Sequence, residues 1–313
     1  MAHRWQLPEY GGIDALEYVP AEVAAPAAGE VTIRLSAVGV NPSDAKSLAG
    51  GWNADPSKLP LPVGQEAAGV VAALGPDTEI ATGPVAVGDR VVAFKIAGAF
   101  ADEVTVAAKD VFALPDSVDD ETAAGLLHVG VVAAELLELS GASAGETLLV
   151  HGASGSVGVL VVQLARRAGV RVIGTASEAN RDKVASFGAE PVVYGDGLAD
   201  RVTALAPNGV DAAVDAAGTA EALEVSLALV GDPARIATLA PGKPAQEAGV
   251  HISAGMRPDS IARRGPLRAV ILGLAADGAI TLPIAATYPL VEATDALRLV
   301  ASGHPGGKVV LTP

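Results

Sequence analysis

The clearest chemical signal in the sequence is a run of eight residues with little side-chain bulk, HGASGSVG, at positions 151–158. Aligned with the dinucleotide-binding pattern G-x-G-x-x-G, it places Ala153 at the first position, Gly155 at the second and Gly158 at the third. Gly155 would let a pyrophosphate touch the main chain, and Gly158 would let a helix pack closely on a strand. The alternative interpretation is an ordinary tight turn between a strand and a helix.

The elements on either side favour the phosphate site. The apolar stretch 147–152 predicts a buried strand and 156–169 a helix, so the amides of Ser156 and Val157 would face the phosphates at the positive helix end. The alternation then continues, with strands expected at 170–177, 190–195, 210–218 and 234–240 and helices at 178–189, 198–207 and 220–231. Apolar strands that alternate with helices predict an α/β domain with a doubly wound, parallel Rossmann sheet.

The end of the strand at 170–177 bears on the choice of cofactor, because an acid there would bond the ribose 2′-hydroxyl of NADH. This strand ends at Ala176 and Ser177 without a carboxylate, and Arg181 follows four residues after the serine. A serine hydroxyl and an arginine suit a 2′-phosphate, so we expect NADPH rather than NADH. Glu178 argues against this choice, because its carboxylate could bond a ribose diol and would repel the phosphate.

The rest of the chain predicts a second domain of different texture. Short β-rich runs at 30–40, 66–75, 87–94 and 101–115 alternate with proline and glycine turns, which is typical of a compact β-barrel-like domain. A largely buried helix is expected from 119 to 141 and an amphipathic helix at 260–280. The stretch 293–313 predicts a helix, a turn and a final strand that resembles the first domain.

Composition restricts the possible functions. The 313 residues are 50% hydrophobic and carry a net charge of -15, so we expect a folded protein that binds neither nucleic acid nor anionic lipid. No apolar run approaches the roughly 20 residues needed to cross a bilayer, and the N-terminus has no hydrophobic signal core, so a cytoplasmic protein without a membrane partner is expected. The absence of cysteine and the scatter of five histidines predict a metal-free mechanism.

Several motifs in order resemble the zinc-independent medium-chain dehydrogenase/reductases, in their quinone oxidoreductase and enoyl reductase branch. They are VGVNPSDAKSLAG (38–50), LPLPVGQEAAGVVAALG (59–75), VGDRVVAF (87–94), the glycine run and the terminal GHPGGKVVL (303–311). The resemblance implies a GroES-like catalytic domain formed by 1–118 and 257–313. It also implies a Rossmann NADPH-binding domain at 119–256, with the active site in the cleft between the two.

The resemblance also bears on zinc. Zinc-dependent relatives carry a cysteine where this chain has Asn41 and a histidine where it has Gln65, and the four-cysteine structural zinc lobe is absent. Hydride transfer would then proceed without a metal ion to polarise a carbonyl. A quinone or an α,β-unsaturated carbonyl suits this chemistry, because the charge left by the hydride is delocalised onto an oxygen that hydrogen-bond donors can stabilise.

Three side chains are candidates for catalytic roles. By resemblance, Asn41 would lie near the nicotinamide ribose and the substrate, although a turn-capping amide before a proline is an equally open interpretation. Lys46 stands where quinone reductases often have a tyrosine, and it would either donate to an oxyanion or be a surface lysine. His128 would either donate a proton or be a buried histidine in an apolar run.

Other positions bear on the cofactor and on assembly. Tyr194 lies one residue from the family's adenine-side tyrosine, so it would either contact adenine or be a plain strand residue. Val132 stands where the family commonly has a threonine that contacts the nicotinamide amide, and valine lacks the hydroxyl. The stretch 249–253 predicts an edge strand in the cofactor domain, through which the family commonly dimerises, so a homodimer is expected.

The leading hypothesis is therefore an NADPH-dependent, zinc-independent reductase of a small-molecule quinone or enone. Two alternatives stay open. One is a nucleotide-binding protein with a redox-responsive or structural role and little turnover, which Val132 favours. The other is a biosynthetic enzyme that applies the same hydride chemistry to one particular enone.

Overall fold

The computed structural model describes residues 2–50, 54–255, 257–303 and 305–313. The chain divides into two compact units. Unit 1 comprises Met1–His128 and Leu272–Pro313, and unit 2 comprises Val129–Ile271. These limits fall inside two helices, α2 (Asp120–Ser140) and α8 (Pro258–Ala276). The sequence-based division at 118/119 and 256/257 leaves both helices whole, and it stays a prediction of where the functional domains begin and end.

Unit 1 is built on two sheets. The larger has the order β15-β16-β3-β5-β6-β8, with β7 pairing β3, and the smaller has the order β2-β1-β4. The strands are β1 (Ala2–Leu7), β2 (Glu17–Ala21), β3 (Glu30–Val40), β4 (Leu61–Pro62), β5 (Glu66–Leu74), β6 (Arg90–Phe94), β7 (Glu103–Ala107), β8 (Val111–Ala113), β15 (Ile284–Pro289) and β16 (Lys308–Thr312). The α-helices α1 (Pro42–Leu48) and α9 (Ala293–Ala301) accompany them, with 3-10 turns at Ile13–Ala15, Pro56–Lys58, Ala108–Asp110 and Leu290–Glu292.

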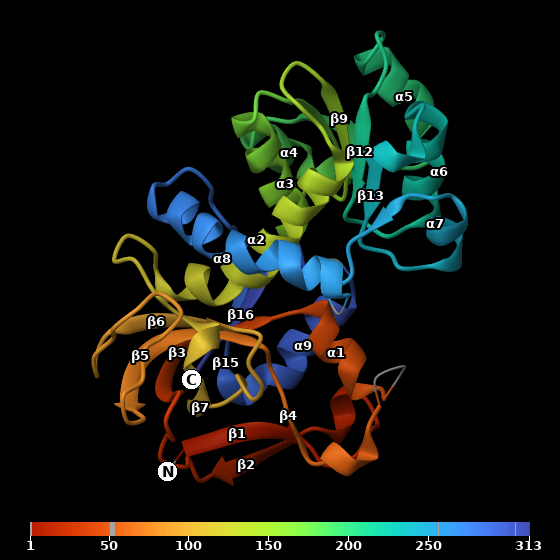
Figure 1. Ribbon diagram of the computed structural model, residues 1–313. Helices are drawn as coiled ribbons and strands as arrows, with labels where there is room; N and C mark the ends of the chain where they lie inside the picture. Colours follow the sequence, from red (N-terminus) through yellow and green to blue (C-terminus); the bar gives the residue numbers. More distant parts are fainter. Residues whose placement is uncertain (1, 51–53, 256, 304) are drawn as a thin grey trace. The chain divides into compact units, whose positions relative to one another are not determined.

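The C-terminal strand belongs to the first sheet. In Figure 1, the blue β16 lies beside the orange β3, and the two pair antiparallel with Val309 opposite Val40. This confirms the expected return of the chain's last strand to the first domain. The small β2-β1-β4 sheet and the strand β15 were not expected from the sequence, because their residues do not form long apolar runs.

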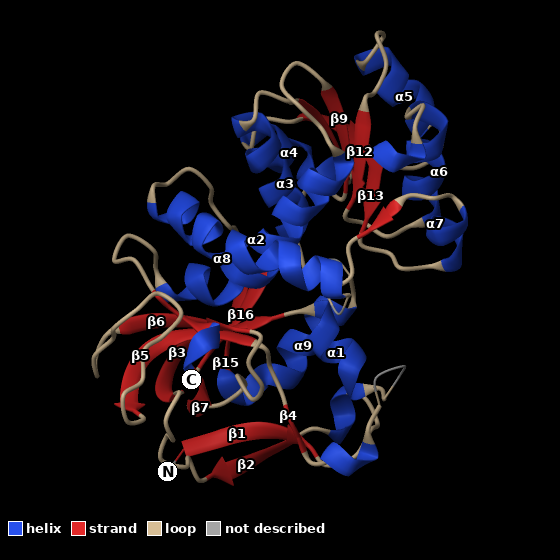
Figure 2. Ribbon diagram, viewed as in Figure 1, coloured by secondary structure: helices blue, strands red, loops and turns tan. Residues whose placement is uncertain are grey.

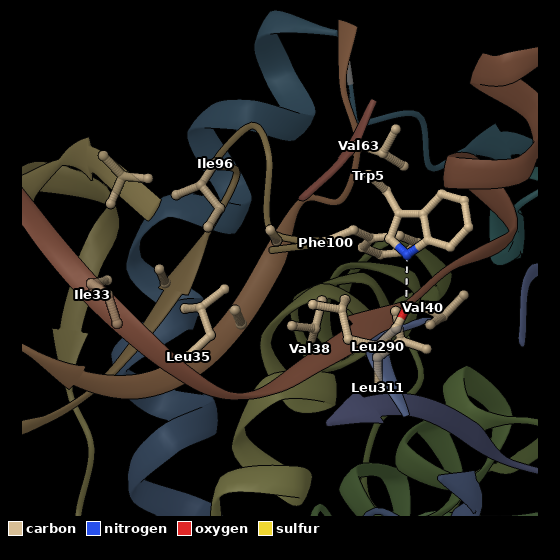
Figure 3. Packing of buried hydrophobic residues seen from close by; sticks show 14 of the residues in the cluster. Trp5, Ile33, Leu35, Val38, Val40, Val63, Ile96, Phe100, Leu290 and Leu311 are labelled. Carbon is tan, nitrogen blue, oxygen red and sulfur yellow. Dashed lines mark hydrogen bonds between the residues drawn. The ribbon is translucent and has the colours of Figure 1, made fainter. Parts of the chain in front are cut away.

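The core of unit 1 ties its early and late segments together. Figure 3 shows Trp5, Phe100 and Leu290 in one apolar cluster with residues of β3 and β16. The indole N–H of Trp5 donates to the carbonyl oxygen of Leu290 at 2.7 Å, so this buried polar group is satisfied. Each fully buried side chain of this kind contributes about 1.5–3 kcal/mol to the free energy of unfolding.

Unit 2 contains a parallel six-stranded sheet with the order β11-β10-β9-β12-β13-β14. Its strands are β9 (Thr147–His151), β10 (Arg171–Ala176), β11 (Glu190–Val193), β12 (Ala212–Asp215), β13 (Ile236–Thr238) and β14 (His251–Ile252). Numbered from β9, this order is the 3-2-1-4-5-6 order of the Rossmann fold. The expected doubly wound sheet is confirmed, and β14 lies at its edge as expected for 249–253.

Helices cover both faces of this sheet, as Figure 2 shows for α3 and α4 on one side and α5 and α6 on the other. They are α3 (Ser156–Arg167), α4 (Arg181–Ser186), α5 (Leu198–Leu205), α6 (Ala220–Leu229) and α7 (Lys243–Glu247), with 3-10 turns at Glu178–Asn180 and Pro233–Arg235. The single helix expected at 178–189 is thus a 3-10 turn followed by a short α-helix. In the central strands β9, β10 and β12 nearly every residue is buried, because both faces are covered.

The structure corrects one expectation about membranes. Helix α2, Asp120–Ser140, is long and apolar enough to cross a bilayer by length and composition alone. However, 67% of its most apolar window is buried inside the protein. Its apolar character is therefore that of a core helix. The acidic residues of its first turn interrupt the apolar run in the sequence, so the length of that run was underestimated there.

Candidate functional site

The glycine run forms the start of α3 in unit 2. Gly155 is the N-cap of this 12-residue helix, with φ -76° and ψ 167°, and no side chain among the described residues caps it. The N–H groups of the first helical turn have no partner within a helix. Those of Ser156 and Val157 are therefore available to an anion, and the helix macrodipole adds positive potential there.

Glycine occupies positions 155 and 158 of the fingerprint for different structural reasons. A Cβ at Gly158 would lie 2.1 Å from the carbonyl oxygen of Gly152, so no larger residue fits where α3 meets the loop. A Cβ at Gly155 would lie 3.4 Å from the same oxygen, which is ordinary contact, and the φ of Gly155 suits any residue. Neither conformation nor internal packing therefore requires glycine at 155, and its bare main chain leaves room for a ligand.

Hydrogen bonds from neighbouring elements hold the loop at 152–154 in place. The N–H of Ala153 donates to the carbonyl oxygen of Thr175 at 3.0 Å, and the N–H of Gly152 donates to the Thr175 hydroxyl at 3.2 Å. From α4, the ammonium of Lys183 donates to the carbonyl oxygen of Ser154 at 2.9 Å. Partial burial lowers the pKa of Lys183. Sequence reasoning missed this lysine, although it follows Arg181 by only two residues.

The residues predicted for the 2′-phosphate lie directly after β10. The Ser177 hydroxyl accepts a hydrogen bond from the Asn180 side chain at 3.0 Å. The Arg181 guanidinium pairs with Glu178 at 3.1 Å, and both side chains are exposed. An exposed ion pair of this kind is worth about 0–1 kcal/mol, so a phosphate could displace the glutamate from the arginine.

Tyr194 and Arg181 line the same depression of about 640 Å³ beside the edge strand β11. Tyr194 is 47% exposed, and its ring is open to a stacking partner. Arg201 lies at the same depression, but its guanidinium is used by the carbonyl oxygens of Val193, Gly195 and Asp196. The structure thus brings Arg181 and Tyr194 together within unit 2.

A buried histidine and carboxylate lie at the ends of β9 and β12, where the strand order reverses. His151 faces Asp215, whose carboxylate accepts hydrogen bonds from the N–H groups of Ala217 and Gly218 and from the Thr238 hydroxyl. Burial lowers the pKa of His151 to about 4, against the opposing effect of Asp215. His151 is therefore neutral at pH 7, and its Nε2 has no hydrogen-bond partner among the described residues.

Unit 1 contains a second polar site, centred on Asn41. The Asn41 Nδ2 donates to Glu66 Oε1 at 2.9 Å, and the Lys308 ammonium donates to Asn41 Oδ1 at 2.6 Å and to Glu66 Oε1 at 2.7 Å. None of the three residues is more than 2% exposed. Burial raises the pKa of Glu66, but Lys308 acts in the opposite direction and the net pKa is lowered, so Glu66 is ionised.

Asp44 extends this network at the start of α1. Its carboxylate accepts the N–H of Asn41 at 2.8 Å and the side-chain amide of Gln65 at 2.8 Å. Complete burial raises the pKa of Asp44 to about 6, with Gln65 and Asn41 acting in the opposite direction. Asn41 is the residue before the helix, as the capping interpretation expected, but its main-chain N–H makes the bond to the third helical residue, while its side-chain amide contacts Glu66 and Lys308.

The other two candidate residues differ in their relation to this network. His128 lies beside it, because its main-chain N–H donates to Glu66 Oε2 at 3.0 Å, while its ring packs edge-on against Phe94 at 5.7 Å. Lys46 is exposed on α1 and forms no hydrogen bond or ion pair with the Asn41 network among the described residues. Sequence reasoning named neither Glu66 nor Lys308 as site residues, although both lie in motifs that carried the family resemblance.

Within the described ranges, no group of three or more histidine, cysteine, aspartate and glutamate side chains could hold a metal ion. Asn41 and Gln65, which stand where zinc-dependent relatives have ligands, are both engaged by Asp44 or Glu66. Carboxylates that accept hydrogen bonds from amides and from an ammonium are satisfied without a metal ion. The donor set of unit 1 therefore fits a hydrogen-bonded network better than a metal centre.

Comparison with known proteins identifies the class. Residues 27–116 match the alcohol dehydrogenase GroES-like domain, and residues 187–311 match the zinc-binding dehydrogenase domain. The solved structure of a mycobacterial quinone oxidoreductase matches with a TM-score of 0.81 and 32% identity, covering 100% of both chains. The chain therefore belongs to the medium-chain dehydrogenase/reductase family, with a GroES-like domain and a Rossmann domain.

Within this family, the relatives include quinone oxidoreductases and enoyl reductases. A mycobacterial protein solved in complex with NADPH matches with a TM-score of 0.85 and 30% identity over 100% of both chains. The trans-enoyl reductase of Trichoderma harzianum is 34% identical over 67% of this chain and 62% of its own length. The mouse synaptic vesicle membrane protein VAT-1 homolog is 37% identical over 39% of this chain, and the match spans only 29% of that relative.

Proposed function

We propose that this chain is an NADPH-dependent oxidoreductase that reduces a small quinone or an α,β-unsaturated carbonyl without a metal ion. The single observation that carries the proposal is Gly155, an uncapped helix N-terminus with no side chain, at the loop after the first strand of a 3-2-1-4-5-6 sheet. This is where Rossmann domains bind a dinucleotide pyrophosphate. A relative with the same architecture is solved with NADPH.

The residues of unit 2 fit this cofactor in distinct places. The main chain at Gly155, Ser156 and Val157 would hold the pyrophosphate, and Gly158 keeps α3 close to the loop. The cofactor, when bound, supplies the hydride. What the protein supplies is a fixed position for the cofactor and the exclusion of competing reactions.

The 2′-phosphate and adenine have their own proposed partners in unit 2. Ser177 and Arg181 would hold the 2′-phosphate after Arg181 leaves Glu178. Tyr194, open on the same depression as Arg181, would stack on the adenine. These assignments predict that NADPH binds more tightly than NADH, because only NADPH gains the contact with the arginine.

In unit 1 we propose that the Asn41 network forms the polar part of the site for the nicotinamide and the substrate. Asn41 would donate its remaining N–H to an oxygen, and His128, beside Glu66, is the candidate proton donor. Lys46 is exposed, so it is the weakest of the three catalytic candidates. We also propose that the protein is a cytoplasmic homodimer, with a GroES-like domain at 1–118 and 257–313 and a Rossmann domain at 119–256.

The test is a spectrophotometric screen in which NADPH and NADH are offered with quinones, enones and enoyl thioesters. We expect NADPH oxidation with a quinone or an enone. Replacing Gly155 by valine should raise the Kd for NADPH about 100-fold, which is about 3 kcal/mol, and should leave thermal stability nearly unchanged. Gly231→Val is the matched control, because Gly231 is exposed in the same unit with nothing within 4 Å of its Cβ position.

Two results would contradict the proposal. One is an absence of NADPH oxidation with every acceptor in the screen. The other is unchanged NADPH affinity in Gly155→Val. Tight NADPH binding without turnover would instead favour a nucleotide-binding protein, for which the buried Val132 in place of a hydroxyl-bearing residue is the supporting observation. Turnover confined to one enone would favour a specialised enone reductase, a class that includes a relative of this chain.

A further inference from the structure

The buried contacts of Asn41 define which end of its side-chain amide is which. Lys308 can only donate and an ionised Glu66 can only accept. The lysine therefore requires the amide oxygen on its side, and the glutamate requires the amide nitrogen on the other. Asn41 is 1% exposed, and a turned-over amide would place its N–H groups against the Lys308 ammonium and its oxygen against the Glu66 carboxylate, which leaves both buried contacts unsatisfied.

We infer that Lys308, together with Glu66, is a positioning residue of the proposed hydride-transfer site, which holds the Asn41 amide in one orientation. The inference rests on the proposed function for its catalytic part only. With Lys308 in place, Asn41 presents one free N–H in a fixed direction. Without it, the amide could turn over and present an oxygen where a donor is required, and small errors of this kind are costly in catalysis.

Strand register places Lys308 at this point. The antiparallel pairing of β16 with β3 sets Val309 opposite Val40, so Lys308 comes opposite Asn41, directly after the end of β3. Because successive side chains of a strand alternate between faces, a slip of one residue would turn Lys308 to the other face of the sheet. The contact is therefore specified by the fold of the sheet and not by local sequence.

Two glycines make room for the network. A Cβ at Gly39 would lie 2.6 Å from Glu66 Oε1 and 2.3 Å from the carbonyl oxygen of Ala124. A Cβ at Gly125 would lie 2.6 Å from the Lys308 side chain. Strand β3 and helix α2 thus each lack a side chain where the carboxylate and the lysine stem lie, as expected of a site that is closely packed around these two groups.

The first experiment observes the amide directly. The chain has four asparagines, at 41, 53, 180 and 208, so 15N-asparagine labelling gives four side-chain NH2 pairs in an NMR spectrum, and Asn41→Ala assigns one of them. In the wild type we expect the Asn41 pair to be a single, slowly exchanging species. Lys308→Met should shift it and speed its exchange at least tenfold. An unchanged Asn41 pair in Lys308→Met would overturn the inference.

The second experiment measures the coupling during turnover. We expect Asn41→Ala and Lys308→Met each to lower kcat about tenfold, and the double variant to be no worse than either, because both remove the same oriented amide. Multiplicative losses, about 100-fold in the double variant, would show that Lys308 acts independently of Asn41 and would overturn the inference. Lys308→Arg, which keeps the charge and the donors, should recover part of the activity.

Two further variants separate positioning from stability. The double-charge variant, Glu66→Gln with Lys308→Met, removes both buried charges together. It should be more stable than either single variant, while its kcat stays low. Arg264→Met is the matched control, because Arg264 forms a buried ion pair with Glu135 at 2.8 Å and both residues belong to unit 2. Any decrease in kcat that Arg264→Met causes should multiply with the decrease caused by Asn41→Ala. Recovery of full kcat in the double-charge variant would show that Lys308 acts through stability alone.

Failure of the inference and failure of the proposed function give different results. If the wild type oxidises no NADPH with any acceptor, the proposed function fails, and the NMR experiment alone decides whether Lys308 orients Asn41. If the wild type turns over and Lys308→Met leaves both the NMR pair and kcat unchanged, the function stands and the inference fails.

Discussion

In unit 2 the candidate site consists of main-chain amides at the start of α3, whereas in unit 1 it consists of charged side chains that are at most 2% exposed. The first is made by leaving side chains out, at Gly155 and Gly158. The second is made by burying side chains that satisfy one another, around Glu66 and Lys308. Changing a residue near the main-chain site should cost the protein little stability. Removing one of two paired buried charges should cost much more, because the other charge is left without its partner. The two sites should therefore respond differently to substitution.

The largest expected difference concerns the buried charges of unit 1. Glu66→Gln leaves the Lys308 ammonium without its carboxylate, and breaking a buried pair from one side typically costs about 3–5 kcal/mol. Urea unfolding should show this loss, and adding Lys308→Met should restore most of it. A Glu66→Gln variant as stable as the wild type would mean that the pair is not buried as the structure shows.

The pH dependence of stability should have opposite signs in the two units, beginning with Asp44 in unit 1. Its pKa rises from 3.8 to about 6 on folding, so its contribution is full below pH 3.8 and is lost as the pH rises through 6. At about 1.4 kcal/mol per pKa unit, the loss is about 3 kcal/mol. Unfolding measured from pH 3.5 to pH 7 should show this trend flattened in Asp44→Asn.

His151 in unit 2 should act in the other direction. Its pKa falls from 6.5 to about 4 on folding, so stability is full above pH 6.5 and is lost as the pH falls through 4, by about 3 kcal/mol. In His151→Asn, the acid-side loss should shrink. If Asp44→Asn and His151→Asn change the slope of unfolding free energy against pH in the same direction, the contrast between the two units is wrong.

A smaller effect should distinguish the two glycines of unit 2. Gly158→Ala forces a methyl group against the carbonyl of Gly152 and should cost about 1–3 kcal/mol. Gly155→Ala meets only ordinary contact and should change stability by less than about 0.5 kcal/mol, while it weakens NADPH binding. Equal losses of stability in the two variants would show that Gly155 is also required by packing.

The smallest effect is expected at the exposed ion pair. Glu178→Ala frees the Arg181 guanidinium and removes a carboxylate near the proposed 2′-phosphate, so NADPH should bind about 2–5-fold more tightly. NADH affinity should not rise, since NADH has no phosphate at that position and would lose any bond from Glu178 to its ribose diol. Titration with both cofactors at low and high salt would check this, because the gain should shrink as salt screens the charges.

The two sites also differ in how far the sequence predicts them. The glycine run, Ser177 and Arg181 lie within 31 positions of one another in a strand-helix-strand unit, and local pattern sufficed to find them. Lys308 and Asn41 are separated by 267 positions, and only the pairing of β16 with β3 brings them together. The sequence showed an apolar final strand, but not that its lysine would lie opposite a buried amide.

The same distinction holds for the fold. The central Rossmann strands β9, β10 and β12 were predictable because their residues are mostly apolar and nearly all buried. The strands β1, β2 and β15 were not, because they are partly exposed and their residues alternate with polar or proline positions. Helix α2 was expected as a buried helix, and its membrane-like composition follows from the same burial.

The discontinuous make-up of unit 1 has a consequence for biosynthesis. Residues 129–271 leave the ribosome as one continuous stretch, so unit 2 can fold while the chain is still growing. The first sheet must wait for β16, and until Lys308 emerges, Glu66 has no ammonium to offset its burial. We therefore expect the earlier segments of unit 1 to stay open on a nascent chain and to be the part that chaperones shield, even though they are made first.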